Sequence, residues 1–224
     1  MILNLVETDD RKIYVGTDFH LGHQQKFVYE ARGFGCVRDH DEAIIASVNA
    51  RVRPNDILIF LGDWCLNTKM EQFDAYLDAV KCQNIYALWG NHNNPHEKAV
   101  YYNGIGRKFV EGILVETYPF RYKNMLYLPS YVEAILNGQY CILQHYPIMV
   151  WNHMKNGAWM LCGHSHGAYE PTSANYPEGK ILDCNWDDFG KPLSLPEIRA
   201  IMDKKKIVGA GHHQPDEPVE PKKE

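Results

Sequence analysis

The chain has 224 residues, of which 45% are hydrophobic, and it carries a formal net charge of -5. This length suffices for one large domain with a buried core, and the acidic balance disfavours a general nucleic-acid binder, because phosphate backbones are held by clustered Lys and Arg. No apolar run approaches the roughly 20 residues of a membrane span, and the acidic N-terminus does not resemble a signal peptide, so we expect a cytoplasmic protein.

The first half of the chain alternates apolar strands with amphipathic helices. Strands are predicted at residues 13–17, 57–61 and 84–89, and helices are predicted to begin at Asp39 and Met70. Residues 24–38 contain two glycines and are predicted to form a loop. Strands and helices that alternate with short connections predict parallel pairing through right-handed crossovers.

The second half is richer in strands. These are predicted at residues 113–116, 125–128, 140–144, 159–162 and 180–183, with a last helix after Pro192. The short turns between them indicate a mixed or second sheet. Residues 208–224 contain mainly Gly, His, Pro, Glu and Lys, and we expect this segment to be disordered. The domain should therefore cover residues 1–207.

The chain contains six cysteines and no CxxC pair. Four of them lie within or beside apolar strand-like runs, where a free thiol packs as a small hydrophobic group. We therefore expect reduced, buried thiols in preference to disulfides.

Eight side chains able to bind metal occur in an ordered series of short motifs, and most follow an apolar run. They are Asp18 and His20 in TDFH, Asp63 in LGDW, Asn91 and His92 in GNHN, His145 in LQHYP, and His164 and His166 in GHSH. Asp, His and Asn together suit manganese, iron(II), nickel or zinc. Two such ions in one site polarise a phosphate and supply hydroxide near neutral pH.

Each motif alone has an ordinary explanation. An isolated DxH can be a polar pair in a surface loop, Asp63 can cap the segment that follows it, and one histidine at a strand end is more often a core residue than a ligand. An ionised Asp63 beyond a wholly apolar strand needs a partner, however, because burying it alone is costly. Five such motifs in order favour metal ligation.

The ordered motifs resemble the signature of the calcineurin-like metallophosphoesterase superfamily, which is D-x-H, G-D, G-N-H-[DE], H and G-H-x-H. The likeness extends from about residue 13 to residue 183. A closer resemblance exists to a subgroup of small bacterial and phage phosphoesterases. Its features here are DFHLGH, the pair Asp41 and Glu42, HYP with Trp151 nearby, GHSHG, and the segment DCNWDDFGKPLSLPEI.

This resemblance implies an α/β fold of four layers (αββα), with two mixed β-sheets flanked by helices. It implies two divalent metal ions, with Mn²⁺ as the first candidate and Fe²⁺, Ni²⁺ or Zn²⁺ as alternatives. One would be held by Asp18, His20, Asp63 and His166, and the other by Asp63, Asn91, His145 and His164. Asp63 would bridge the ions beside an attacking hydroxide. His92 would act at the leaving group, and Asn91 would also contact substrate.

One position departs from the family signature. Asn93 stands where the family has an acidic residue after the histidine. An amide cannot stabilise an imidazolium as a carboxylate does, so general-acid catalysis by His92 should be weakened. We expect an Asn93→Asp variant to turn over esters with poor leaving groups faster.

Two further residues are substrate-binding candidates. His23 extends the first motif and could reach a phosphate or simply pack in its loop. Arg32 could hold a phosphate with its planar guanidinium, or lie on the solvated surface. His40 and His96 have polar neighbours and are expected on the surface.

The expected activity is hydrolysis of phosphodiesters or phosphomonoesters of small molecules, among which nucleotides are candidates. A nuclease and a non-catalytic binding scaffold are the alternatives. The acidic balance disfavours the nuclease, and the complete set of expected ligands disfavours the scaffold.

Overall fold

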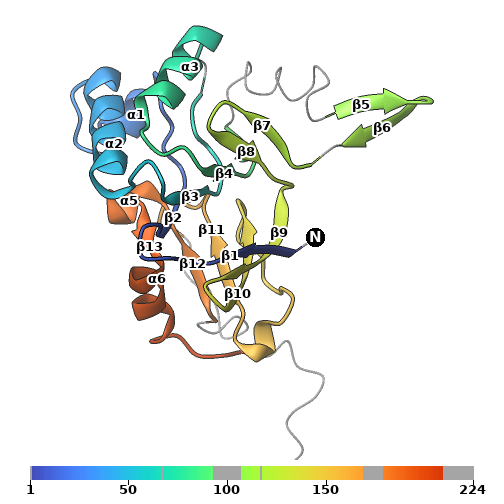
Figure 1. The fold of residues 1–224 in the computed structure, drawn as a ribbon. Helices are drawn as coiled ribbons and strands as arrows, with labels where there is room; N and C mark the ends of the chain where they lie inside the picture. The colour runs from blue at the N-terminus through green and yellow to red at the C-terminus, as the bar shows by residue number, and fades with distance from the viewer. Residues whose placement is uncertain (1, 67, 93–106, 117, 169–178, 209–224) are drawn as a thin grey trace, which may run out of the picture.

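The structure is a computed structural model that describes residues 2–66, 68–92, 107–116, 118–168 and 179–208 (Figure 1). Asn93, His96 and all but the first residue of the predicted C-terminal tail lie outside these ranges. The described part divides into two sheets, a separate hairpin and the helices that accompany them.

One sheet has six strands, and its four central strands are parallel, as the first half of the sequence predicts. A strand at each edge runs antiparallel to its neighbour. In order across the sheet the strands are β13 (Leu193–Ser194), β2 (Ile13–Gly16), β3 (Ile57–Phe60), β4 (Ile85–Ala87), β8 (Met125–Tyr127) and β7 (Phe120–Tyr122). The crossovers contain α2 (Val37–Arg51) and α3 (Met70–Ala79).

The second sheet has five strands and is also mixed, because only its β9–β10 pair is antiparallel. Its order is β1 (Ile2–Leu5), β9 (Tyr131–Leu136), β10 (Gln139–Gln144), β11 (Trp159–Cys162) and β12 (Ile181–Asp183). A separate hairpin joins β5 (Arg107–Val110) to β6 (Ile113–Glu116).

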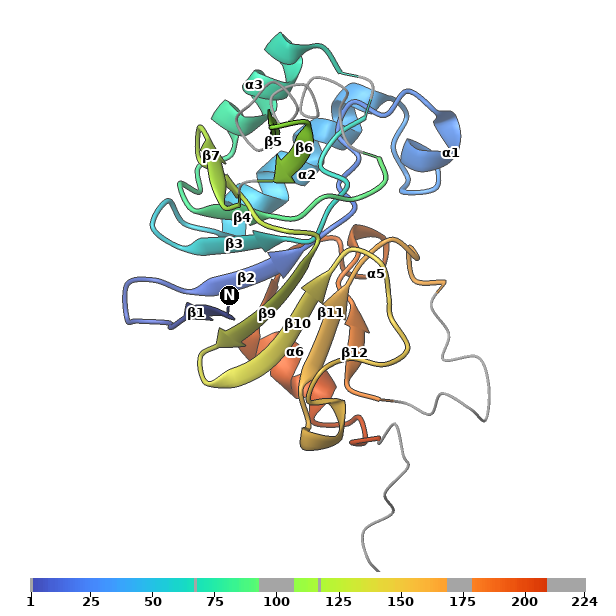
Figure 2. The same ribbon diagram turned by 90° about the vertical axis from the view of Figure 1, so that its right-hand side faces the viewer.

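The two sheets face each other across the main hydrophobic core (Figure 2). Alternate residues of β3 show how the layers are built, since successive side chains of a strand point to opposite faces. Ile57 and Ile59 enter the core between the sheets, whereas Leu58 and Phe60 pack into the core shared with α2 and α3. The α/β class with two mixed sheets is therefore confirmed.

The outer face of the five-stranded sheet packs against a connecting segment. Ile142 and Met160 on this face pack with Trp151 and Ala158, which belong to the segment 146–158. That segment contains one short 3₁₀ helix, η2 (Met154–Asn156). Within the described residues, this segment thus covers the outer face of the five-stranded sheet.

Three shorter helices complete the described part. They are α1 (Lys26–Tyr29), which lies within the predicted loop, α5 (Trp186–Phe189), and α6 (Leu195–Met202). The last helix begins with a capping box formed by Ser194 and Glu197. No helix in the described ranges is long and apolar enough to cross a bilayer. None of the six cysteines, all within the described ranges, forms a disulfide, and five of them are buried, as predicted.

Candidate metal centre

The predicted ligands gather where the carboxyl ends of strands from both sheets meet. Asp18 and Asp63 follow the neighbouring parallel strands β2 and β3, and His145 and His164 follow β10 and β11 of the other sheet. Parallel strands present their following loops at one edge, so residues far apart in sequence converge there.

Five of the seven predicted metal ligands have a positive backbone φ. The angles are 59° at Asp18, 53° at His20, 62° at Asp63, 72° at His164 and 49° at His166. Non-glycine residues adopt this left-handed conformation rarely and at some energetic cost, and such residues concentrate at functional sites. The backbone turns immediately after the strands and directs these side chains toward one another.

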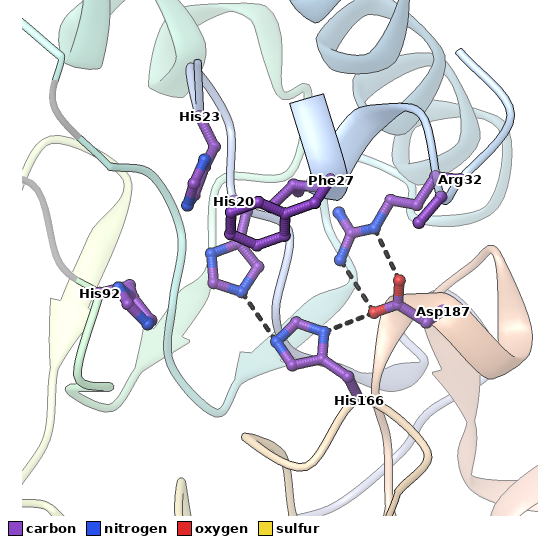
Figure 3. Close-up of a pocket in the computed structure, with 9 residues that line it drawn as sticks. His20, His23, Phe27, Arg32, His92, His166 and Asp187 are labelled. Carbon is purple, nitrogen blue, oxygen red and sulfur yellow. Dashed lines mark hydrogen bonds and ion pairs between the residues drawn. The ribbon is translucent and has the colours of Figure 1, made fainter. Parts of the chain in front are cut away.

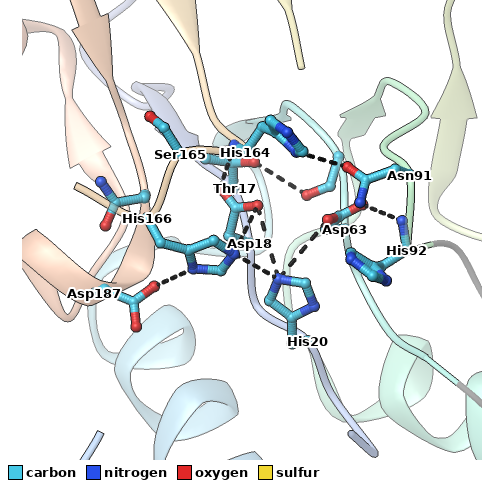
Figure 4. Close-up of polar contacts among 12 residues, drawn as sticks. Thr17, Asp18, His20, Asp63, Asn91, His92, His164, Ser165, His166 and Asp187 are labelled. Carbon is cyan, nitrogen blue, oxygen red and sulfur yellow. Dashed lines mark hydrogen bonds and ion pairs between the residues drawn. The ribbon is translucent and has the colours of Figure 1, made fainter. Parts of the chain in front are cut away.

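The first cluster contains Asp18, His20 and His166 (Figure 4). The Nε2 atoms of His20 and His166 are 3.2 Å apart, and each lies within 3.9 Å of Asp18 Oδ1. Asp63 Oδ2 is 3.7 Å from His20 Nε2. The four residues that the family resemblance implies for one ion are thus brought together.

The second cluster surrounds His145. Its Nε2 lies 2.9 Å from Asn91 Oδ1 and 3.4 Å from Asp63 Oδ2. Asn91 Oδ1 is also 2.8 Å from His164 Nδ1. These are the four residues implied for the other ion. Asp18 could also join Asp63 and His145 around one ion, so both carboxylates lie between the clusters.

The hydrogen bonds of His145 fit a metal ion at this position. Its Nδ1 is 3.1 Å from the carbonyl oxygen of Leu61, which can only accept a hydrogen bond, so Nδ1 carries a proton. A neutral ring would then point the lone pair of Nε2 at the oxygens of Asn91 and Asp63. A second proton or a metal ion resolves this conflict. The Asp63 carboxylate raises the pKa of His145 even though burial opposes the charged ring.

Two carboxylate oxygens supply further evidence that the residues fit a metal. Asp18 Oδ1 and Asp63 Oδ2 are buried and have no hydrogen-bond partner among the described residues. Leaving such atoms unpaired costs free energy. Burial raises the pKa of Asp18 to about 6, against the lowering effect of His145 and His166. A divalent cation at this point would satisfy both oxygens.

The remaining oxygens of the two aspartates are held by the backbone. Asp63 Oδ1 accepts the N–H of His92 at 2.8 Å, and Asp18 Oδ2 accepts the N–H of His164 at 3.0 Å. Glycines permit this approach: a Cβ at Gly90 would lie 1.9 Å from Asp63 Oδ1, and one at Gly163 would lie 2.7 Å from Asp18 Oδ2. Each carboxylate is thus oriented with one oxygen facing the clusters.

Asp187, at the start of α5, is a functional candidate that was not predicted from the sequence. Its Oδ2 accepts the Nδ1–H of His166 at 2.6 Å, which leaves His166 Nε2 free to bind a metal. Hydrogen bonds from His166 and Arg32 lower the pKa of Asp187, although burial alone would raise it. The acidic run DCNWDDFG was a signal, but spacing along the chain does not pair it with GHSH.

Arg32 was predicted to bind substrate or to be solvated, and the structure places it differently. Its side chain is 4% exposed. The five guanidinium N–H groups point to the carbonyls of Asp18 and Phe19, to both oxygens of Asp187, and to His40 Nε2. No donor remains for a phosphate, so Arg32 positions the loop that bears Asp18 and His20.

His40 was expected on the surface and is instead fully buried on α2. Its Nδ1 lies 2.8 Å from Asp41 Oδ1. Both oxygens of Asp41 also accept the backbone N–H of Gly22, and Asp41 Oδ2 accepts the hydroxyl of Tyr76 at 2.6 Å. This network fixes the turn between His20 and His23, which gives the Asp41 of the subgroup resemblance a structural role.

His92 and His23 line a pocket beside the first cluster. The ring of His92 lies 5.5 Å from that of His20 and 6.3 Å from that of His23, measured between centroids. His23 Nδ1 accepts the N–H of Gln25, so its proton resides on Nε2. Both candidates therefore lie next to the predicted ligands.

No protein-family model matches this chain. The uncharacterised protein MJ1445 of Methanocaldococcus jannaschii is 27% identical over 202 residues, covering 88% of this chain and 95% of that protein. A crystal structure of a protein of unknown function, AQ665 from Aquifex aeolicus, superposes with a TM-score of 0.58 at 17% identity. The superposition covers 86% of this chain and 100% of the AQ665 chain. This similarity shows that the two proteins share a fold. The chemistry has to be inferred from the residues of the site.

Proposed function

We propose that the chain is a phosphoesterase that uses two divalent metal ions, Mn²⁺ foremost, and that it belongs to the calcineurin-like metallophosphoesterases. Its substrates would be small phosphodiesters or phosphomonoesters, with nucleotides among the candidates. The observation that carries the proposal is the arrangement of acceptor atoms around His145. His145 Nε2, Asn91 Oδ1 and Asp63 Oδ2 converge, and a bound metal ion would satisfy all three.

The residues divide between two ions that share Asp63. Asp18, His20 and His166 would complete one set, and Asn91, His145 and His164 the other, consistent with the distances above. Bound divalent ions would neutralise charge on the phosphoryl oxygens and lower the pKa of a water molecule.

The protein side chains would prepare the site for this chemistry. Leu61 and Asp187 fix the protonated Nδ1 atoms of His145 and His166, so that both rings present Nε2. The backbone N–H of His92 holds Asp63 while its imidazole remains exposed beside the pocket. From there His92 could donate a proton to the departing oxygen of the ester.

The test is hydrolysis of bis(p-nitrophenyl) phosphate and p-nitrophenyl phosphate with added Mn²⁺, comparing the wild type with Asp63→Asn. We expect Mn²⁺-dependent turnover that the variant loses, and the ratio of the two rates would assign the diester or monoester class. His92→Ala should retain metal but lose about a hundredfold in turnover. Absence of turnover with Mn²⁺, Ni²⁺ and Zn²⁺, despite bound metal, would contradict the proposal.

A further inference from the structure

The pocket beside the first cluster has an apolar wall formed by α1. It has a volume of about 480 Å³ and lies between the histidines of the site and that helix (Figure 3). His20, His92 and His166 line the metal side, and Phe27, Val28 and Ala31 line the other. A pocket of this size accommodates a small organic group.

Phe27 is the most exposed large hydrophobic side chain in the described residues, at 72%. It contributes to none of the buried hydrophobic clusters described here. Its ring meets that of His23 edge to face, with centroids 5.9 Å apart. Aromatic rings that are exposed beside a candidate site are typical of surfaces that become buried when a ligand binds.

The charged groups of this pocket are already paired. Arg32 and Asp187 are joined by two hydrogen bonds of 2.8 and 2.9 Å, and Asp187 also binds His166. Away from the metal ligands and His92, the lining therefore offers a planar ring, aliphatic groups and no unpaired charge among the residues named for it. Such a lining favours a neutral, planar ligand group.

We infer that this pocket binds a neutral aromatic group of the substrate, such as an aryl ring or a nucleobase, with Phe27 as its stacking partner. The inference rests on the proposed function, because the phosphate of the same molecule would bind at the metal centre. It adds the substrate class, phosphoesters with an aromatic group close to the phosphorus, and identifies Phe27 as a specificity-determining residue.

The test compares two ligands that are not hydrolysed, phenylphosphonate and methylphosphonate, by calorimetric titration of the Mn²⁺-loaded full chain. They share the phosphonate and differ in the aromatic ring. We expect phenylphosphonate to bind at least about tenfold more tightly, as one stacked ring usually provides. Phe27→Ala and Phe27→Leu should reduce this preference to about threefold or less, and Phe27→Tyr, which restores a ring, should retain it.

Ile113→Ala is the matched control, because Ile113 is 68% exposed and lies on the β5–β6 hairpin. It should leave the preference unchanged. Equal affinity for the two phosphonates would overturn the inference while leaving the metal centre intact, and so would a Phe27→Leu variant with the full wild-type preference. If neither phosphonate bound to the metal-loaded protein, the proposed function itself would be contradicted.

Discussion

His166 and Asp187 form a 2.6 Å hydrogen bond between Nδ1 and Oδ2, and this bond orients a predicted metal ligand from a different element of the fold. His166 follows β11, whereas Asp187 lies on α5. A carboxylate behind a metal-binding histidine fixes the ring and makes it a stronger ligand. The cluster thus depends on a residue that does not itself face its centre.

Replacing Asp187 should weaken metal binding without unfolding the chain. In Asp187→Asn the amide can present an oxygen to His166 but loses the charge, so we expect Mn²⁺ affinity to fall by roughly 10- to 100-fold. Calorimetric titration measures this change. Asp203→Asn, an exposed position at the end of α6, is the control, and an Asp187→Asn affinity equal to that control would remove the assigned role.

Arg32 should contribute to stability more than to phosphate binding. Arg32→Met removes two hydrogen bonds to Asp187 and the donor to two backbone carbonyls. We expect a loss of roughly 2–4 kcal/mol in the free energy of unfolding, somewhat below that of a fully buried pair because Asp187 retains water contact. Urea denaturation would measure it, with Arg38→Met, 79% exposed, as the control. A stable variant with a raised KM alone would restore the substrate-binding role.

Gly163 should not tolerate a side chain. A Cβ there would lie 2.4 Å from Thr17 Oγ1 and 2.7 Å from Asp18 Oδ2. We expect Gly163→Ala to destabilise the fold by about 1–3 kcal/mol and to displace Asp18, lowering metal affinity as well. A Cβ at Gly35 would have no atom within 4 Å. Gly35→Ala should therefore change neither the stability of the fold nor the metal affinity. Unaltered metal affinity in Gly163→Ala would show that Asp18 does not need this close contact.

Glu197 should add a pH-dependent increment to stability. Burial opposes its charge, but Lys191, Ser194 and Arg51 outweigh this and lower its pKa to about 2. Because the folded pKa is depressed, the stabilisation is complete above the unfolded value near 4.5 and is lost as the pH falls toward 2.

Glu197→Gln tests this linkage. Glutamine can keep the capping box but loses the charge that pairs with Lys191 and Arg51, so the change should cost about 1 kcal/mol at pH 7, and the difference from the wild type should shrink between pH 4.5 and 2. Thermal or urea unfolding at several pH values measures both. A difference that stays constant over that range would contradict the linkage.

The sequence predicts much of the scaffold because its strands are short apolar runs that end at polar motifs. Residues 57–61 illustrate this: the apolar run forms β3, and Asp63 follows directly. Two elements that carried a signal were not predicted. The strand Tyr131–Leu136 alternates buried side chains with exposed or half-buried ones, and His40 shares a helical stripe with Ile44 and Val48.

The supporting contacts could not be predicted in the same way. Arg32 and Asp187 are separated by 155 residues, and their pairing arises only when α5 packs beside the first loop. Local patterns report which face of an element is apolar, but they do not report which polar groups meet across elements. Candidate ligands were therefore predictable, whereas the residues that position them required the tertiary structure.

The most direct test of the central claim is the number of Mn²⁺ ions that the metal-free protein binds. Calorimetric titration, checked by elemental analysis after dialysis, should give two ions per chain for the wild type and at most one weakly bound ion for Asp63→Asn. A wild type that binds no Mn²⁺, or an Asp63→Asn variant that binds two ions as tightly, would contradict a centre built on a shared Asp63.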